Sequence, residues 1–194
     1  MSSFEIKYSG DFKKFEKFLD SKRHMKILET EVGQATAMNA ALIQDEIIRR
    51  ILTRNFKTKN SPLTIALKKS STPLIDTSDM MKAIDVELKG SFTAFVGFLK
   101  NQKTSHGGNM NQVVPRLEKG FEVKITPQMK MWLYAKMRRA GIAPNPVKTS
   151  SSGVLRIPPR PFITPVFESK AMARKLNRNW KEAVKRAYKQ MGAL

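Results

Sequence analysis

Residues 84–98 read Ile-Asp-Val-Glu-Leu-Lys-Gly-Ser-Phe-Thr-Ala-Phe-Val-Gly-Phe, and this stretch decides the fold class. Apolar side chains recur at every second position on either side of Gly90, which is the pattern of two strands that each bury one face. Gly90 and Ser91 favour a tight turn between the two runs, so the stretch predicts an antiparallel β-hairpin. We expect this hairpin to form the heart of a small antiparallel sheet.

Further elements of the core follow the hairpin. Apolar alternation at 121–125 predicts a third core strand, and residues 154–157 read as another short strand. Between them, Thr126 and Pro127 supply a hydroxyl cap and a first-turn proline for a helix that should stop at Gly141. The buried stripe expected on this helix consists of Met129, Trp132, Leu133 and Met137.

Residues 1–56 are expected to form an N-terminal strand and a helical arm. Apolar positions at helical spacing run from residue 25 to residue 56, which corresponds to a helix roughly 45 to 50 Å long. Gly33 and Asn39 are the positions at which this helix can bend. A helix of that length must project from the core of so small a protein or pack along a neighbouring subunit.

The segment that follows the arm is less regular. Residues 57–72 are largely polar and basic and predict a loop, in which Ser61 and Pro62 can cap a short helical turn. A few residues later, Thr77 or Ser78 can cap another turn that holds two methionines.

Two further loops are expected to be mobile, at residues 101–111 and 142–153, because both are rich in turn-forming residues. Between the first of them and the strand at 121–125, residues 113–119 predict a helical turn interrupted by Pro115. The whole chain, residues 1–194, is expected to be a single domain whose α+β core spans residues 73–194.

The C-terminal segment joins a stiff connector to a basic helix. Three prolines in residues 156–162 fix the backbone and should orient whatever follows. From Phe162 onward, apolar residues at helical spacing predict one helix with a buried stripe. The opposite half of this helix carries Lys170, Arg174, Lys175, Arg178, Lys181, Lys185, Arg186 and Lys189. The predicted fold class is therefore α+β: a small antiparallel sheet with a long N-terminal helix and a basic C-terminal helix packed against it.

Charge narrows the range of partners. The 194 residues carry 36 lysines and arginines against 16 acidic residues, for a formal net charge of +20. Such a surplus favours contact with phosphate or with an acidic protein surface, although a solvated face is the simpler interpretation. No stretch has the length and apolarity of a membrane span. We expect no membrane partner, and binding of the last helix to an anionic membrane surface is a third alternative.

Little in the sequence points to catalysis. There are no cysteines, and the two histidines, His24 and His106, have no companion carboxylates at ligand spacing. The glycines Gly107 and Gly108 are not followed by the lysine of a phosphate loop, and no nucleophile-elbow pattern is present. We expect no enzymatic activity, no metal and no cofactor.

Four short motifs occur in a fixed order, at residues 73–81, 117–121, 125–133 and 156–162. Together they resemble the virion morphogenesis family of tailed bacteriophages, the Mu-like tail-completion, neck and head-tail joining proteins. The chain departs from the family pattern at Ser78, where a glycine is usual. The positions that match are Leu74, Asp76, Thr77, Glu118, Gly120, Thr126, Met129, Ile157, Pro158, Arg160, Pro161 and Phe162.

The resemblance implies a non-enzymatic subunit of a homo-oligomeric ring in the neck or upper tail, between the DNA-filled head and the tail. Its partners would be the portal, head-tail connector or tail proteins of the same virion, and it would reside in the host cytoplasm during assembly. The basic helix would face either packaged DNA, through nonspecific contact, or an acidic neighbouring ring.

A standalone basic nucleic-acid-binding protein is the alternative interpretation. It predicts tight binding by the isolated chain, with an affinity that falls steeply as salt rises. Few aromatic residues accompany the basic ones, which argues against stacking on single strands.

Overall fold

The computed structural model describes residues 22–53, 60–68, 79–99, 102–104, 107–143 and 153–191. The strand and short helix expected before residue 22 lie outside these residues. So do Thr77 and Ser78, which were expected to cap a helical turn, and most of the 142–153 loop.

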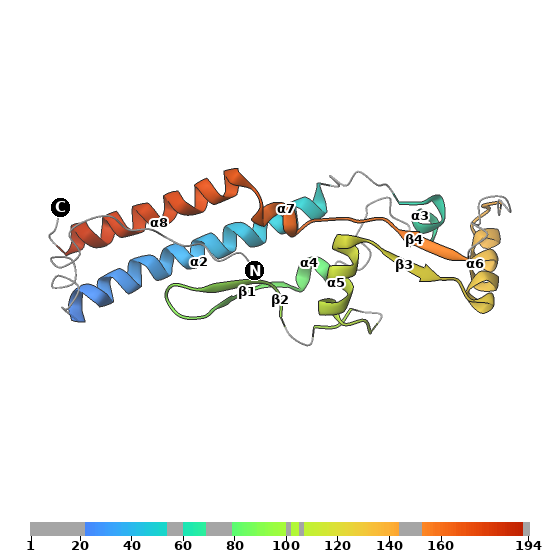
Figure 1. Cartoon of the computed structure of the whole chain (residues 1–194), viewed down its shortest axis with the longest axis horizontal. Coiled ribbons are helices and arrows are strands. Elements are labelled where there is room, and N and C mark those ends of the chain that lie inside the picture. The colour runs from blue at the N-terminus through green and yellow to red at the C-terminus, as the bar shows by residue number, and fades with distance from the viewer. Residues whose placement is uncertain are drawn as a thin grey trace.

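The molecule is elongated, with its longest helices at one end and a small sheet with a short helix at the other (Figure 1). Helix α2 (Lys22–Leu52) is 31 residues long and continuous through Gly33 and Asn39, so the bend allowed there does not break it. Asn39 points its side chain across to the C-terminal helix, and therefore does not compete for the backbone of α2.

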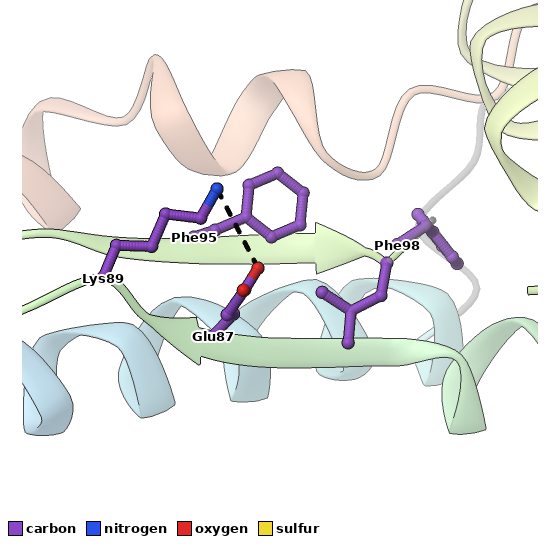
Figure 2. Close-up of a pocket in the computed structure, with 5 residues that line it drawn as sticks. Glu87, Lys89, Phe95 and Phe98 are labelled. Carbon is purple, nitrogen blue, oxygen red and sulfur yellow. Dashed lines mark ion pairs between the residues drawn. The ribbon is translucent and has the colours of Figure 1, made fainter. Parts of the chain in front are cut away.

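The predicted hairpin is confirmed. Strands β1 (Ile84–Leu88) and β2 (Ala94–Phe98) pair antiparallel, with Ile84 opposite Phe98, and both of these side chains are buried. One face of the hairpin packs on α2. The other face is open: Phe95 is 40% exposed there, beside an ion pair between Lys89 and Glu87 (Figure 2).

The expected third strand forms, but it does not join the hairpin. Strand β3 (Phe121–Lys124) pairs antiparallel with β4 (Val154–Ile157) in a separate two-stranded sheet. Only alternate residues of β3 are half-buried. Such alternation marks a strand without identifying its partner, so the prediction of one sheet was wrong while the α+β class is confirmed.

Helix α5 (Met110–Lys119) begins earlier than predicted and is not interrupted. The side chain of Asn109 caps it by accepting the N–H of Asn111. Pro115 lies inside the helix, where it removes the backbone bond to the carbonyl of Asn111. Both residues are exposed, so water can satisfy that carbonyl. The loop expected at 101–111 therefore ends at Asn109.

Helix α6 (Pro127–Arg139) has the predicted caps but not the predicted burial. Thr126 Oγ1 accepts the N–H of Met129 at 3.2 Å, and Gly141 follows the helix with φ of 67°. No residue of α6 is buried, and Trp132 is 52% exposed. The helix lies at the far end of the molecule, where the short α3 (Pro62–Lys68) is its neighbour. The prediction that one side of this helix is buried was therefore wrong, because the core does not extend to this end.

The N-terminal caps of the shorter elements agree with the sequence in part. In α3 the side chain of Ser61 accepts the N–H of Thr64, as expected for the turn within the 57–72 segment. Helix α4 (Asp79–Lys82) holds Met80 and Met81.

The C-terminal segment forms two helices rather than the single one expected. A short α7 (Thr164–Phe167) ends before Ser169, whose hydroxyl caps α8 (Lys170–Gln190). Helix α8 then packs along α2, with Ala183 and Ala187 fully buried between them. The apolar stripe continues through the break between α7 and α8, so helical spacing alone did not reveal the break. Ser169 is a residue type that favours a helix N-cap, and it is the signal that could have revealed the break.

The main core lies where the end of α2, the hairpin, α4, α5 and α7 meet. Its members are drawn from these elements and, through Phe162, from the connector before α7, so they fix the mutual positions of all of these segments. They are Ile47, Ile51, Met80, Ile84, Phe98, Met110, Val114, Phe162 and Val166.

Candidate interaction surface

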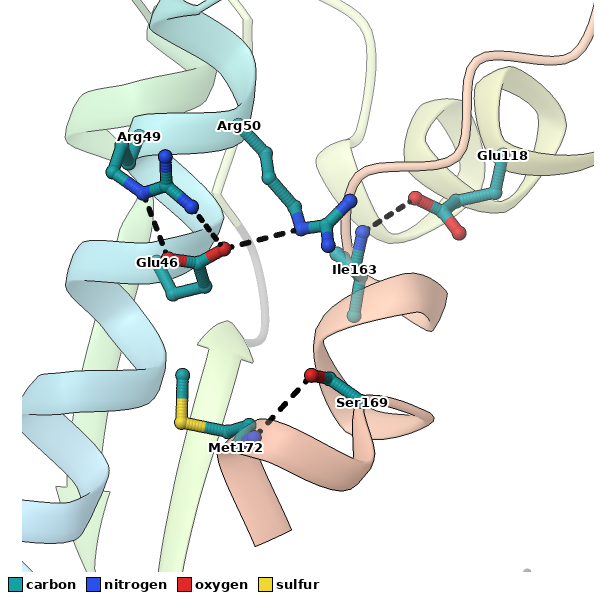
Figure 3. A network of polar contacts seen from close by, with 7 residues as sticks. All are labelled: Glu46, Arg49, Arg50, Glu118, Ile163, Ser169 and Met172. Atoms are coloured by element: carbon teal, nitrogen blue, oxygen red, sulfur yellow. Dashed lines mark hydrogen bonds and ion pairs between the residues drawn. The ribbon is translucent and has the colours of Figure 1, made fainter. Parts of the chain in front are cut away.

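Residues of the second and fourth motifs meet in the structure. Glu118, at the end of α5, directs its carboxylate at the start of α7 and accepts the N–H groups of Phe162, Ile163 and Thr164. Figure 3 shows the contact with Ile163. The Ile163 bond is 2.8 Å long, and the hydroxyl of Thr164 donates to the same carboxylate at 2.7 Å. A carboxylate that accepts several N–H groups at a helix start also complements the helix dipole. Glu118 therefore caps α7 from another helix.

Gly120 and Arg160 hold the connector on its other side. Gly120 has φ of 72°, and a Cβ atom there would lie 2.7 Å from the carbonyl oxygen of Ile157 and 2.8 Å from the nitrogen of Pro159. The N–H of Arg160 donates to the carbonyl of Leu117 at 2.8 Å. We call Glu118, Gly120 and residues 157–162 the connector clamp.

The side chain of Arg160 is partly buried. Its Nη2 donates to Oδ1 of Asn60 at 3.0 Å, and burial lowers the pKa of Arg160. Asn60 is itself buried, at 6% exposure. Sequence reasoning missed Asn60, because a single asparagine in a basic segment carries no signal of burial. Arg160 thus serves the fold rather than an exposed surface.

The remaining motif positions are not part of the clamp. Leu74, Asp76 and Thr77 lie outside the described residues. Thr126 and Met129 lie at the start of α6, at the end of the molecule that holds the β3–β4 sheet. The clamp therefore unites two of the four motifs.

Removal of the Glu118 carboxylate tests whether the clamp stabilises the fold. Glu118→Ala should lower the free energy of unfolding by about 2 kcal/mol, because three backbone N–H groups lose a charged acceptor. Urea denaturation measures the change. Glu122→Ala is the matched control, since the side chain of Glu122 is 59% exposed and pairs with the exposed Arg156, and it should change stability by less than about 0.5 kcal/mol. Equal losses in the two variants would contradict the capping role.

The eight basic residues predicted on the last helix are all exposed on α8. They do not form one uniform surface. At 100° per residue, six of them fall in a row about 100° wide, on the side opposite Ala183 and Ala187, while Lys175 and Arg186 lie beside it. We call Lys170, Arg174, Arg178, Lys181, Lys185 and Lys189 the basic row.

Arg186 is turned toward α2 instead. Its Nε donates to Glu31 at 2.8 Å, and Nε2 of Gln190 donates to the other oxygen of the same carboxylate at 2.7 Å. Glu31 is only 8% exposed, and the hydrogen bond from Arg186 is the main reason that its pKa is lowered. Arg186 therefore joins α8 to α2 and is not part of the basic row.

This pair gives the α2–α8 contact a dependence on pH. Because the folded-state pKa of Glu31 is lowered, its stabilisation is present above the ordinary glutamate pKa and is lost as pH falls through the folded value. Glu31→Gln should flatten the acid side of the curve of unfolding free energy against pH, measured by urea denaturation. Glu29→Gln, at an exposed position on the same helix, controls for the change of charge. An unchanged acid slope in Glu31→Gln would refute this assignment.

Apolar side chains are exposed in both halves of the molecule. Along the hairpin, a hollow of about 390 Å³ is lined by Glu87, Lys89 and Phe95 of the open face and by Phe98 and Leu99 at the end of β2 (Figure 2). On α6, Trp132 is 52% exposed, and Nζ of Lys136 lies 5.5 Å from the centre of its ring. Exposed apolar surface of this kind can mark sites of protein contact.

Among the described residues there is no group of three or more histidine, aspartate or glutamate side chains able to hold a metal ion. Within the same residues no helix is long and apolar enough to cross a membrane.

Comparison with known proteins gives no identification: no family model, no curated protein and no solved structure matches the chain. The resemblance to the phage family therefore rests on the four motifs themselves.

Proposed function

We propose that this chain is a non-enzymatic structural subunit of a tailed-phage virion, part of a neck or tail-completion ring that joins the DNA-filled head to the tail. The connector clamp carries the proposal. Glu118 and Gly120 of one motif contact the backbone of residues 157–164, which contain another motif, so positions singled out by the resemblance are used together. If the two motifs matched the family by chance, there would be no reason to expect their residues to contact each other in the fold.

The shape of the subunit gives independent support. Aromatic side chains are exposed in both halves of the elongated molecule, Phe92 and Phe95 in the hairpin and Trp132 on α6, which suits a subunit whose neighbours complete its surface (Figure 1). Ring contacts join two different surfaces of neighbouring copies, which an elongated subunit with two such regions can provide. The proposed partners are further copies of this chain and the portal, connector or tail proteins of the same virion.

Oligomer formation tests the proposal. We expect native mass spectrometry and negative-stain images of the purified chain, alone or mixed with the adjacent portal or connector protein, to reveal closed rings. Trp132→Glu should impair ring formation because it places a charge on the exposed face of α6. Phe167→Glu, at an exposed position near the core, is the matched control. A chain that stays monomeric under every one of these conditions would count against a ring subunit.

The alternative of a standalone nucleic-acid-binding protein is favoured by one observation, the basic row on α8. The two functions differ in where the protein is found. A ring subunit should be present in purified particles, whereas a standalone binder should remain with nucleic acid in the cell lysate. Quantitative mass spectrometry of the two fractions distinguishes them.

A further inference from the structure

The basic row has a regular geometry. Its six cations follow one another at intervals of four, four, three, four and four residues, so they stay on one side of α8. At 1.5 Å per residue the row is about 28 Å long. Because the opposite side of α8 is packed on α2, the row points away from the protein.

Little of this charge is neutralised by the residues that the structure describes. Among the described residues, the acidic partner found for the row is Glu182, which pairs with Lys185 at 3.1 Å. Glu31, the buried carboxylate near α8, is occupied by Arg186 and Gln190 outside the row. Cations held this close repel one another, so a polyanion that neutralises them would bind favourably.

The row also lacks exposed apolar anchors of the kind that protein interfaces use, since Tyr188, which falls at the edge of the row at 100° per residue, is half-buried. Such interfaces are poor in lysine at their centre and depend on buried aromatic or aliphatic side chains. In the described part of α8 the exposed large apolar residue is Trp180, which lies on the packed side and donates its Nε1–H to Thr36 of α2 at 3.4 Å. Lysine and arginine without such anchors are typical of contact with backbone phosphates.

We infer that the basic row binds the phosphate backbone of duplex DNA, without recognition of base sequence. This inference goes beyond the proposed function, because a ring subunit does not require a DNA contact of its own. It also selects six of the eight cations of α8 and assigns Arg186 to the α2–α8 contact instead.

Salt dependence measures the number of phosphates contacted. Each contact contributes about −0.9 to the slope of log affinity against log salt, so six contacts should give a slope of about −5. The full chain would be titrated against a fluorescent duplex of about 20 base pairs at 50 to 200 mM salt, with two unrelated sequences. We expect the same slope and affinity for both sequences.

The variant Lys170→Gln, Arg174→Gln, Arg178→Gln should reduce the magnitude of the slope by about three and weaken binding. A control with the same loss of charge at the other end of the molecule, Lys119→Gln, Lys124→Gln, Arg139→Gln, should retain the parental slope. All six positions are exposed, and the melting temperatures of both variants verify that the fold is kept.

Three outcomes would overturn the inference. They are equal weakening by both triple variants, a slope unchanged by the row variant, and tighter binding of a polyglutamate peptide than of the duplex. The last of these would assign the row to an acidic protein. Ring formation is measured without DNA. A failure to bind DNA would therefore overturn this inference without deciding whether the chain forms rings.

Discussion

Phe162→Ala should lower the free energy of unfolding by about 3 to 5 kcal/mol, the largest loss expected for any side chain of the connector. Phe162 is fully buried among the residues of the main core, where the connector enters α7. The truncation removes apolar surface from that core and leaves a cavity that the surrounding helices cannot fully close. Phe162 ends the fourth motif, and it has the largest fully buried side chain in the part of the chain that the structure describes.

Phe167→Ala is the matched control for this prediction. Phe167 lies on α7, which begins at Thr164 just beyond the connector, but it is 56% exposed, so its truncation should change stability by less than about 0.5 kcal/mol. Urea denaturation monitored by circular dichroism measures both variants. Similar losses for the two phenylalanines would mean that the connector does not enter the core as described.

Gly120→Ala should cost about 3 kcal/mol or more, for two separable reasons. The positive φ of 72° is itself unfavourable for a residue with a side chain, by about 1 to 2 kcal/mol. The new Cβ would also lie 2.7 Å from the carbonyl oxygen of Ile157 and 2.8 Å from the nitrogen of Pro159, both backbone atoms that cannot rotate away. Displacement of the connector adds a further cost of the size seen for overpacked sites, about 1 to 3 kcal/mol.

Gly141→Ala isolates the first of these reasons. Gly141 has a similar φ of 67°, but a Cβ there would meet nothing within 4 Å. This variant should therefore lose only the conformational contribution of about 1 to 2 kcal/mol. Thermal and urea unfolding of both variants would reveal the difference. If Gly120→Ala were no more destabilising than Gly141→Ala, the backbone of Ile157 and Pro159 would not lie as close to Gly120 as described.

Features encoded by neighbouring residues could be predicted from the sequence. The hairpin at 84–98 follows from alternation and a turn, and α6 follows from Thr126, Pro127 and Gly141. Each of these signals acts within a few residues, so it does not depend on the rest of the fold. The same holds for the turn capped by Ser61.

Features that depend on distant partners could not be predicted. The alternation in β3 did not reveal that its partner is β4 rather than the hairpin. The stripe on α6 was placed in the core because helical periodicity cannot tell a core face from an exposed apolar one. Trp132 is therefore a surface residue that hydrophobicity alone assigned to the interior.

The candidate surface was predictable in part. The eight cations of α8 could be found from their spacing, and they are exposed. Arg186 could not be separated from the others, because its partner Glu31 is on a helix at the other end of the chain. In the same way, the motifs singled out Glu118 and Phe162 as structural positions. The hydrogen bond between them could be seen only in the folded structure, because the two residues are far apart in the sequence.

The position of the chain in an intact virion tests the proposed function most directly. We expect a cryo-electron microscopy reconstruction of tailed particles from the genome that encodes this chain to contain its elongated fold as a closed ring. The antiparallel α2 and α8 and the hairpin beside α2 are the features to fit. Our account predicts this ring between the head and the tail. Particles that lack the chain, or that hold it in the capsid shell or the distal tail, would contradict it.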